Sequence, residues 1–236
     1  MALYPIDLKD LDREIAAIGL KRMGVFRFGE EHLRKDDQQL LGRTGVLIGN
    51  TGPDMWSEFS LSPEYGDGGM DPMNRWTKRV LETLAQGLCE TCIFPFDEPY
   101  WPFQRFLSSA AGLKPSPLGL YMHPEYGLWH ALRGVLVFSS EEYDLLSHSN
   151  AEDENSEGMI QHPCDSCDHK PCLSACPVDA FTGSALDVEP CFAHLDSKND
   201  PACMEIGCRA RHACPIGTQH RYTNEQIRFH MRSYRY

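Results

Sequence analysis

The chain has 236 residues, of which 42% are hydrophobic, and its 34 Asp and Glu residues outnumber its 22 Lys and Arg residues. The resulting net charge of −12 argues against the phosphate backbone of a nucleic acid or an anionic membrane as the main partner. The charged N-terminus lacks the apolar core of a signal peptide, and no apolar run approaches the roughly 20 residues that span a bilayer. We therefore expect a cytoplasmic protein.

The first 147 residues alternate between helical and strand patterns of apolar residues. The predicted elements, in chain order, are helix 7–20, strands 23–28 and 44–49, helix 75–88, strand 93–96, helix 102–113, and strands 118–123 and 131–140. Such a mixture predicts an α+β fold with a layered α/β domain over residues 1–147.

Residues 148–158 are polar and charged, which predicts a solvated linker. The segment that follows, 159–219, is rich in cysteine and poor in aliphatic residues, so bound metal must supply much of its stability. The tail, 220–236, contains Ile227, Phe229 and Met231 at a spacing that predicts a short helix packed against the protein.

Disulfides are not expected in a reducing compartment, so the spacing of the ten cysteines has to be explained by metal binding or catalysis. Eight of them form two groups, and each group ends in Cys-Pro: Cys164, Cys167, Cys172 and Cys176, then Cys191, Cys203, Cys208 and Cys214. Bacterial ferredoxins carry a similar run, in which the fourth cysteine of a group binds the other cluster.

Applied here, this crossing rule predicts two [4Fe-4S] clusters in a domain that resembles bacterial ferredoxin. The first set of ligands would be Cys164, Cys167, Cys172 and Cys214, and the second set Cys176, Cys191, Cys203 and Cys208. Two structural zinc sites are the alternative, although zinc knuckles usually pair two C-x2-C motifs and this segment has one. Upstream, Cys89 and Cys92 form a separate C-x2-C motif, which we leave outside the predicted site.

Two adjacent clusters conduct single electrons, so the larger domain is expected to hold the acceptor. The double Cys-Pro pattern behind an α/β domain, together with FPFDEPYWPFQRFLSSAAGL and HPEYGLWHALRGVLVF, resembles the epoxyqueuosine reductases, which are cobalamin-dependent iron-sulfur enzymes. The stretch LGLYMHPEYGLWHALRGVLV is also similar to the CblC cobalamin-processing family. The resemblance implies a nitroreductase-like fold for the first domain and covers roughly residues 90–215.

The resemblance also implies roles for individual residues. Asp97 lies where the reductases have a proton-donating aspartate, and His123 lies where the CblC family has a histidine of its corrinoid pocket. Tyr126 and Trp129 are further candidates for lining a cofactor pocket, since corrinoid pockets are broad and apolar. For Asp97, the alternative is a structural carboxylate near a helix N-terminus.

These observations predict an iron-sulfur oxidoreductase that passes single electrons to a cobalamin in the first domain. The upstream electron donor would be a reductase, a ferredoxin or a flavodoxin, and the substrate a corrinoid or another small molecule. Two alternatives stay open. In the first alternative, the protein is a ferredoxin-like carrier that docks a partner enzyme. In the second, it is a reductase that uses FMN.

Overall fold

The computed structural model describes residues 8–139, 161–183, 185–197 and 200–235. The chain divides into two compact units, each built from two segments. Unit 1 comprises Met1–Gly112 and Ala131–Met159, and unit 2 comprises Leu113–His130 and Ile160–Tyr236. Residues 113–130 thus belong to the unit that contains the cysteine-rich segment, whereas the sequence analysis placed them in the first domain.

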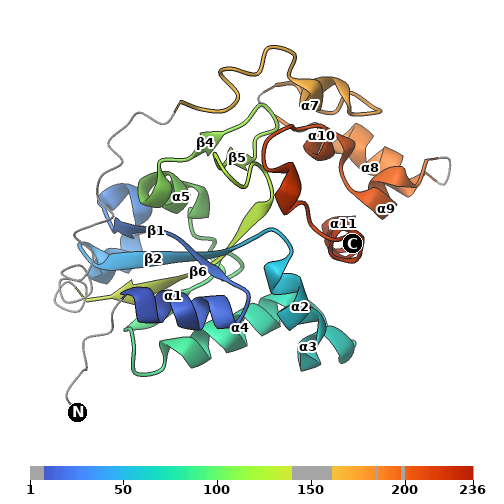
Figure 1. Ribbon diagram of the computed structural model, residues 1–236. Helices are drawn as coiled ribbons and strands as arrows, with labels where there is room; N and C mark the ends of the chain where they lie inside the picture. The colour runs from blue at the N-terminus through green and yellow to red at the C-terminus, as the bar shows by residue number, and fades with distance from the viewer. Residues whose placement is uncertain (1–7, 140–160, 184, 198–199, 236) are drawn as a thin grey trace. The chain divides into compact units, whose positions relative to one another are not determined.

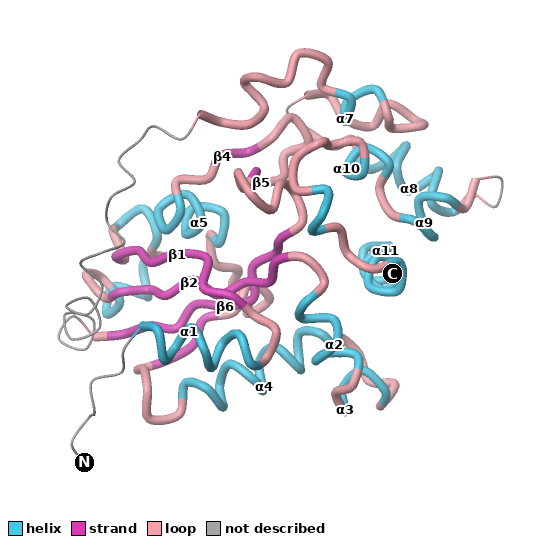
Figure 2. The backbone as a smooth tube through the Cα atoms, in the orientation of Figure 1, coloured by secondary structure: helices cyan, strands magenta, loops and turns pink. Residues whose placement is uncertain are grey.

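A four-stranded sheet forms the centre of unit 1 (Figure 2). Its strands, in spatial order, are β1 (Lys21–Arg27), β2 (Thr44–Thr51), β6 (His130–Phe138) and β3 (Thr91–Ile93). β1 runs antiparallel to β2, and β3 runs antiparallel to β6. All eight residues of β2 are buried, because strands lie on both sides of it and helices cover both faces of the sheet. β3 is an edge strand.

Helices cover both faces of this sheet. α1 (Leu8–Ala17) and α4 (Pro72–Ala85) lie along one face, and α5 (Phe103–Ala111) lies on the other (Figure 1). α1 buries Leu8, Leu11 and Ile15, which recur at the helical period and so share one face. Burial of this face is the main stabilising contribution of such a short helix.

The close approach of α5 to β1 depends on Gly24. This residue has a φ of +144°, and a Cβ placed on it would lie 2.3 Å from the carbonyl oxygen of Ala110 in α5. The absence of a side chain lets the helix backbone touch the strand, where the ring of Phe106 stacks on that of Phe26 at 4.9 Å between centroids.

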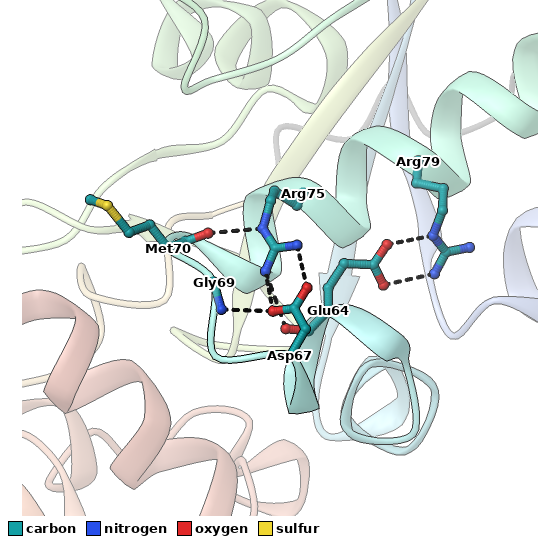
Figure 3. A network of polar contacts seen from close by, with 6 residues as sticks. All are labelled: Glu64, Asp67, Gly69, Met70, Arg75 and Arg79. Carbon is teal, nitrogen blue, oxygen red and sulfur yellow. Dashed lines mark hydrogen bonds and ion pairs between the residues drawn. The ribbon is translucent and has the colours of Figure 1, made fainter.

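After the short helix α2 (Asp54–Ser60), a polar network ties α3 (Pro63–Gly66) and the turn that follows it to α4 (Figure 3). The carboxylate of Glu64, which is only 8% exposed, accepts two hydrogen bonds from Arg79, at 2.5 and 3.0 Å. Arg75 binds both carboxylate oxygens of Asp67 at 2.7 Å. The hydrogen bonds from Arg79 lower the pKa of Glu64 to about 2.

This geometry predicts a pH-dependent contribution of Glu64 to stability. The ordinary pKa of 4.5 is lowered on folding, so the contribution is complete above pH 4.5 and is lost as the pH falls toward 2. We expect Glu64→Gln to lower the free energy of unfolding by about 1 kcal/mol near pH 7, since Arg79 is half exposed and water screens the pair. Denaturant unfolding from pH 7 to 3 measures the difference, which should shrink as the pH falls. The exposed Glu58→Gln is the control, and an equal effect there would contradict the assignment.

Unit 2 consists of short elements joined by loops. They are β4 (Lys114–Pro115), β5 (Tyr121–Met122), α7 (Pro171–Ser174), α8 (Val188–Asp196), α9 (Ala202–Ile206), α10 (Arg209–His212), the 3-10 turn η3 (Thr218–His220) and α11 (Asn224–Arg235). β4 and β5 pair as an antiparallel hairpin. Two further 3-10 segments, η1 (Glu30–His32) and η2 (Lys35–Leu40), belong to unit 1.

The α+β prediction is confirmed at the level of a mixed fold with a small antiparallel sheet and surrounding helices. Helix 7–20, strands 23–28 and 44–49 and helix 102–113 all correspond to observed elements, as does the tail helix. Strand 118–123 is reduced to the two residues of β5, and α2, α8 and α9 were not predicted. The nitroreductase-like and ferredoxin-like assignments stay predictions, and the linker 148–158 lies outside the described residues. None of the described helices has the length and apolar character needed to cross a membrane.

Candidate functional site

Four cysteines of unit 2 line one cavity. They are Cys164, Cys167, Cys172 and Cys214, and the empty volume of the cavity, including its open mouth, is about 360 Å³. The rest of the wall is largely apolar, with Leu118, Met122, Leu128 and Ile216 among the lining side chains. These four thiols are the first set predicted by the crossing rule.

Local sequence and backbone amides determine the surroundings of two of these thiols, Cys172 and Cys214. Lys170 adopts a left-handed conformation with φ +37°, and Pro171 then begins α7, so that Cys172 falls in the first turn of the helix. Burial raises the pKa of Cys172, and the backbone amides of Cys172 and Leu173 lower it by donating to the sulfur. Burial likewise raises the pKa of Cys214, which the amide of Ile216 lowers.

Two glycines join the wall of the cavity to the chain beyond Cys214. A Cβ on Gly127 would lie 2.2 Å from the carbonyl oxygen of Ile216, and a Cβ on Gly217 would lie 2.4 Å from the carbonyl carbon of Tyr126. Both residues have positive φ, at +57° and +68°. The two backbones are therefore in direct contact, and this contact holds loop 116–128 beside the cysteines.

We expect Gly127→Ala to loosen this loop. The matched control is Gly119→Ala, because Gly119 also has positive φ, at +75°, but has no atom within 4 Å of its would-be Cβ. Both substitutions carry backbone strain, and only the first collides with Ile216, so Gly127→Ala should cost about 2 kcal/mol more. Hydrogen-deuterium exchange of peptides covering 116–128 measures the difference. Equal protection in the two variants would contradict the proposed contact.

The second set lies on the helical part of unit 2. Cys191 belongs to α8 and Cys203 to α9, Cys208 directly precedes α10, and the amide of Ala180 donates to the sulfur of Cys176 at 3.3 Å. Burial raises the pKa of Cys191, and the thiolates of Cys208, Cys176 and Cys203 raise it further. Burial also raises the pKa of Cys208, while the amides of Arg211 and Ala210 lower it.

Burial and neighbouring thiolates raise the pKa values of six of the eight thiols. Burial raises the pKa of Cys164 to about 11, and the neighbouring thiolates that add to this effect are Cys214, Cys172 and Cys167. For every cysteine of unit 2 with such neighbours, they belong to its own predicted set. The two sets also border a common apolar core, since Cys176 and Cys208 pack against the same cluster as Cys164.

Among the described residues, no group of three or more His, Cys, Asp or Glu side chains is arranged to hold a single metal ion. The thiolates of a [4Fe-4S] cluster each bind a different iron, so they surround a volume rather than converge on a point. Metal binding by either set of cysteines stays a prediction.

The C-terminal helix packs beside the second set. In α11, the ring of Tyr234 meets that of Phe192 edge to face at 5.4 Å, and Arg235 forms a two-pronged ion pair with Asp196. Burial raises the pKa of Tyr234, as do the thiolates of Cys191 and Cys208. The sequence analysis predicted that the tail packs on the protein but did not assign Phe192 or Tyr234 to the site, because aromatic residues at helical spacing carry no signal for a particular partner.

The histidine and aromatic candidates lie in loop 116–128 and its continuation. The Nδ1 atom of His123 accepts hydrogen bonds from the amides of Glu125 and Tyr126, at 3.1 and 3.2 Å, and so stabilises the turn. The buried ring of Tyr126 lies 4.4 Å from that of His123. Trp129 is fully buried, and the guanidinium of Arg211 lies 4.4 Å above its ring.

Asp97 belongs to unit 1, whereas His123, Tyr126 and Trp129 belong to unit 2. Its side chain is 38% exposed, and one carboxylate oxygen lies 3.7 Å from the ammonium of Lys78. An ion pair of this kind fits the structural interpretation of Asp97. The roles of all four residues stay predictions.

In unit 1, the buried His32 and the exposed Ser109 have the composition of a catalytic dyad, but the tautomer of His32 is the wrong one for that role. His32 lies 2.8 Å from the hydroxyl of Ser109 through Nε2, while its Nδ1 accepts from the amide of Gly29 at 3.0 Å. A neutral ring therefore carries its proton on Nε2 and donates to Ser109 instead of accepting from it. Burial lowers the pKa of His32, which favours this neutral form.

Comparison with known proteins shows similarity at the level of solved structures. No protein-family model matches the chain, and no curated protein matches it. Among solved structures, the chain is similar to CblC, a B12-trafficking protein of C. elegans described as a homologue of human MMACHC, at 17% identity. The match covers 94% of this chain and 88% of that chain with a TM-score of 0.38. Similarity at this level establishes neither a common fold nor a common function.

Proposed function

We propose that unit 2 binds two [4Fe-4S] clusters and that the protein is an iron-sulfur electron-transfer protein of the oxidoreductase class. The observation that supports this most strongly is the cavity lined by Cys164, Cys167, Cys172 and Cys214, four thiols that the crossing rule assigns to one cluster. Sequence places the last of them far from the other three. A cavity shared by all four therefore fits a common ligand.

The residues present suit such a ligand. Buried thiolates are costly without a cation, since burial raises the pKa of the cysteines in both sets, and bound iron would remove that cost. A bound [4Fe-4S] cluster supplies reversible transfer of one electron. Amides that donate to cysteine sulfur and apolar walls that exclude water are the features by which a protein sets the potential of such a cluster.

The residues around the two cysteine sets would have two roles, which are to exclude water and to stabilise negative charge on sulfur. Leu118, Met122 and Leu128 shield the first set from water, and the amides around Cys172 and Cys214 stabilise negative charge on sulfur. Tyr234 and Phe192 cover the second set from α11 and α8. Because both sets border one core, an electron would have a short route between them.

Paired substitutions test the assignment of ligands. Reconstituted wild-type chain should contain about eight irons, one cluster for each set. Cys164→Ser with Cys214→Ser removes two ligands of the first set alone, so about four irons should remain. Cys164→Ser with Cys176→Ser affects one ligand of each set, although both residues lie in the first sequence group, so little iron should remain. Iron and sulfide assays with electron paramagnetic resonance measure the result.

The outcome that would overturn this proposal is specific. If the first double variant lost all its iron while the second kept about half, the ligands would divide by sequence group instead of by the crossing rule. Zinc without sulfide in wild-type protein would replace the clusters by structural zinc sites.

A second part of the proposal concerns the molecule that accepts electrons from the clusters. The resemblance of LGLYMHPEYGLWHALRGVLV to corrinoid proteins supports a cobalamin, with Asp97 as proton donor and His123 as a binding residue. Within unit 2, Arg211 lies over the ring of Trp129, and Tyr126 is packed against His123, so these two aromatic residues do not present open faces for a corrinoid. We therefore assign them to packing and derive no step through that cofactor.

An anaerobic titration of reconstituted protein with hydroxocobalamin tests the acceptor. We expect a saturable change in the visible spectrum, followed by reduction of cobalt when dithionite is added, and a weaker effect for His123→Ala. Full iron content without a spectral change would exclude the corrinoid and leave the ferredoxin-like carrier or an FMN-dependent reductase. FMN added in the same way distinguishes these two alternatives.

A further inference from the structure

The C-terminal end of α11 is bound to the helix that carries Cys191. The Nε atom of Arg235 donates to a carboxylate oxygen of Asp196 at 2.6 Å, and the guanidinium lies 5.1 Å from the centre of the Phe192 ring. Tyr234 meets the same ring at 5.4 Å. Phe192 directly follows Cys191, and Asp196 is the last residue of α8. These contacts therefore fix the position of α8 relative to α11.

The same helix packs against α9, which carries Cys203. The Nε atom of Arg228 in α11 lies 3.5 Å from a carboxylate oxygen of Glu205, and Glu205 is two residues beyond Cys203. Both side chains of this ion pair are exposed, so it contributes little to stability by itself. Packing between the two helices is the larger contribution.

A third contact lies next to Cys208. Gly207, the residue before this cysteine, has a φ of +91°, and a Cβ placed on it would lie 2.9 Å from the Cγ2 atom of Ile227 in α11. The absence of a side chain at Gly207 therefore lets Ile227 approach the backbone beside the cysteine. Three of the four predicted ligands of the second set thus lie in or next to segments that α11 contacts.

We propose that α11 is the positioning element of the second cluster and that the first cluster does not depend on it. This inference rests on the proposed binding of two clusters. Each thiolate of a [4Fe-4S] cluster binds a different iron, so retention of the cluster requires that α8, α9 and the segment after α9 keep their relative positions. The cavity of the first set is instead lined by residues from 116–128, 163–172 and 214–216. Weakening the contacts of α11 should therefore release iron from the second set alone.

Release of iron to a chelator measures this dependence. The reconstituted full chain is kept anaerobic and mixed with an iron chelator, and the absorbance of the iron complex is followed with time. Tyr234→Ala removes the ring that meets Phe192, and Arg235→Gln removes the ion pair and the contact of the guanidinium with that ring. We expect the variant with both changes to release about half of its iron about tenfold faster than wild type, and the rest at the wild-type rate.

Matched variants identify the contact and the cluster. Tyr234→Phe keeps the aromatic contact, and Arg232→Gln removes the charge of an exposed residue of the same helix, so both should release iron at the wild-type rate. The double variant is also made in the background of Cys164→Ser with Cys214→Ser, which lacks ligands of the first set. There, all the remaining iron should be released at the faster rate.

Two glycines test the contact beside Cys208. Gly207→Ala introduces the collision with Ile227, whereas Gly183 has a φ of +92° and its would-be Cβ lies at an ordinary distance of 3.9 Å from a methyl carbon of Leu173. Both substitutions carry the same backbone strain, so Gly207→Ala should accelerate the release of about half the iron and Gly183→Ala should not. Circular dichroism confirms that each variant is folded.

Two results would overturn the inference while leaving the clusters in place. One is equal release from the Tyr234 and Arg235 double variant and from Arg232→Gln. The other is faster release of all the iron, which would mean that α11 supports both clusters. Wild-type protein that takes up no iron would instead overturn the proposed function, and this inference with it.

Discussion

The gathering of eight thiols, three of them buried and five half-buried, in a unit with few aliphatic side chains is the constraint on which the rest of unit 2 depends. A thiol buried without a partner stays protonated, and a thiolate needs a nearby cation or donated hydrogen bonds. Unit 2 supplies backbone amides to several sulfurs and surrounds the first set with apolar residues. Apart from α11, its helices α7, α8, α9 and α10 have 4, 9, 5 and 4 residues, and Cys172, Cys191, Cys203 and Cys208 lie in or directly before them.

Two kinds of contact maintain this organisation from outside the cysteine groups. The glycine pair Gly127 and Gly217 brings loop 116–128 against the chain that follows Cys214, which no residue with a side chain would allow. On the other set, the Arg235 and Asp196 ion pair fixes the end of α11 to the end of α8. Both contacts involve segments that precede or follow the cysteine-rich stretch in sequence. Unit 2 is therefore larger than the cysteine-rich stretch that it contains.

Unit 1 is stabilised in a different way. Its sheet has a fully buried central strand, helices on both faces and aromatic packing between β1 and α5, so it does not need a metal to form a core. Charged groups are placed at its periphery, where Arg79 compensates the buried carboxylate of Glu64. Cys89 and Cys92 are the thiols of this unit, and they donate to the backbone carbonyls of Thr91 and Leu81.

The sequence by itself determined the α+β class and most helices of unit 1, because apolar periodicity is a local property of the chain, while the division of eight cysteines into two sets stays a prediction from their spacing. It did not predict α8 or α9, since their residues follow the geometry of the cysteines more than an amphipathic pattern. Only the tertiary structure placed residues 113–130 with the cysteines, brought Tyr234 to the second set and joined Gly127 to Gly217. Each of these features depends on contacts between residues distant in sequence, which no local spacing encodes.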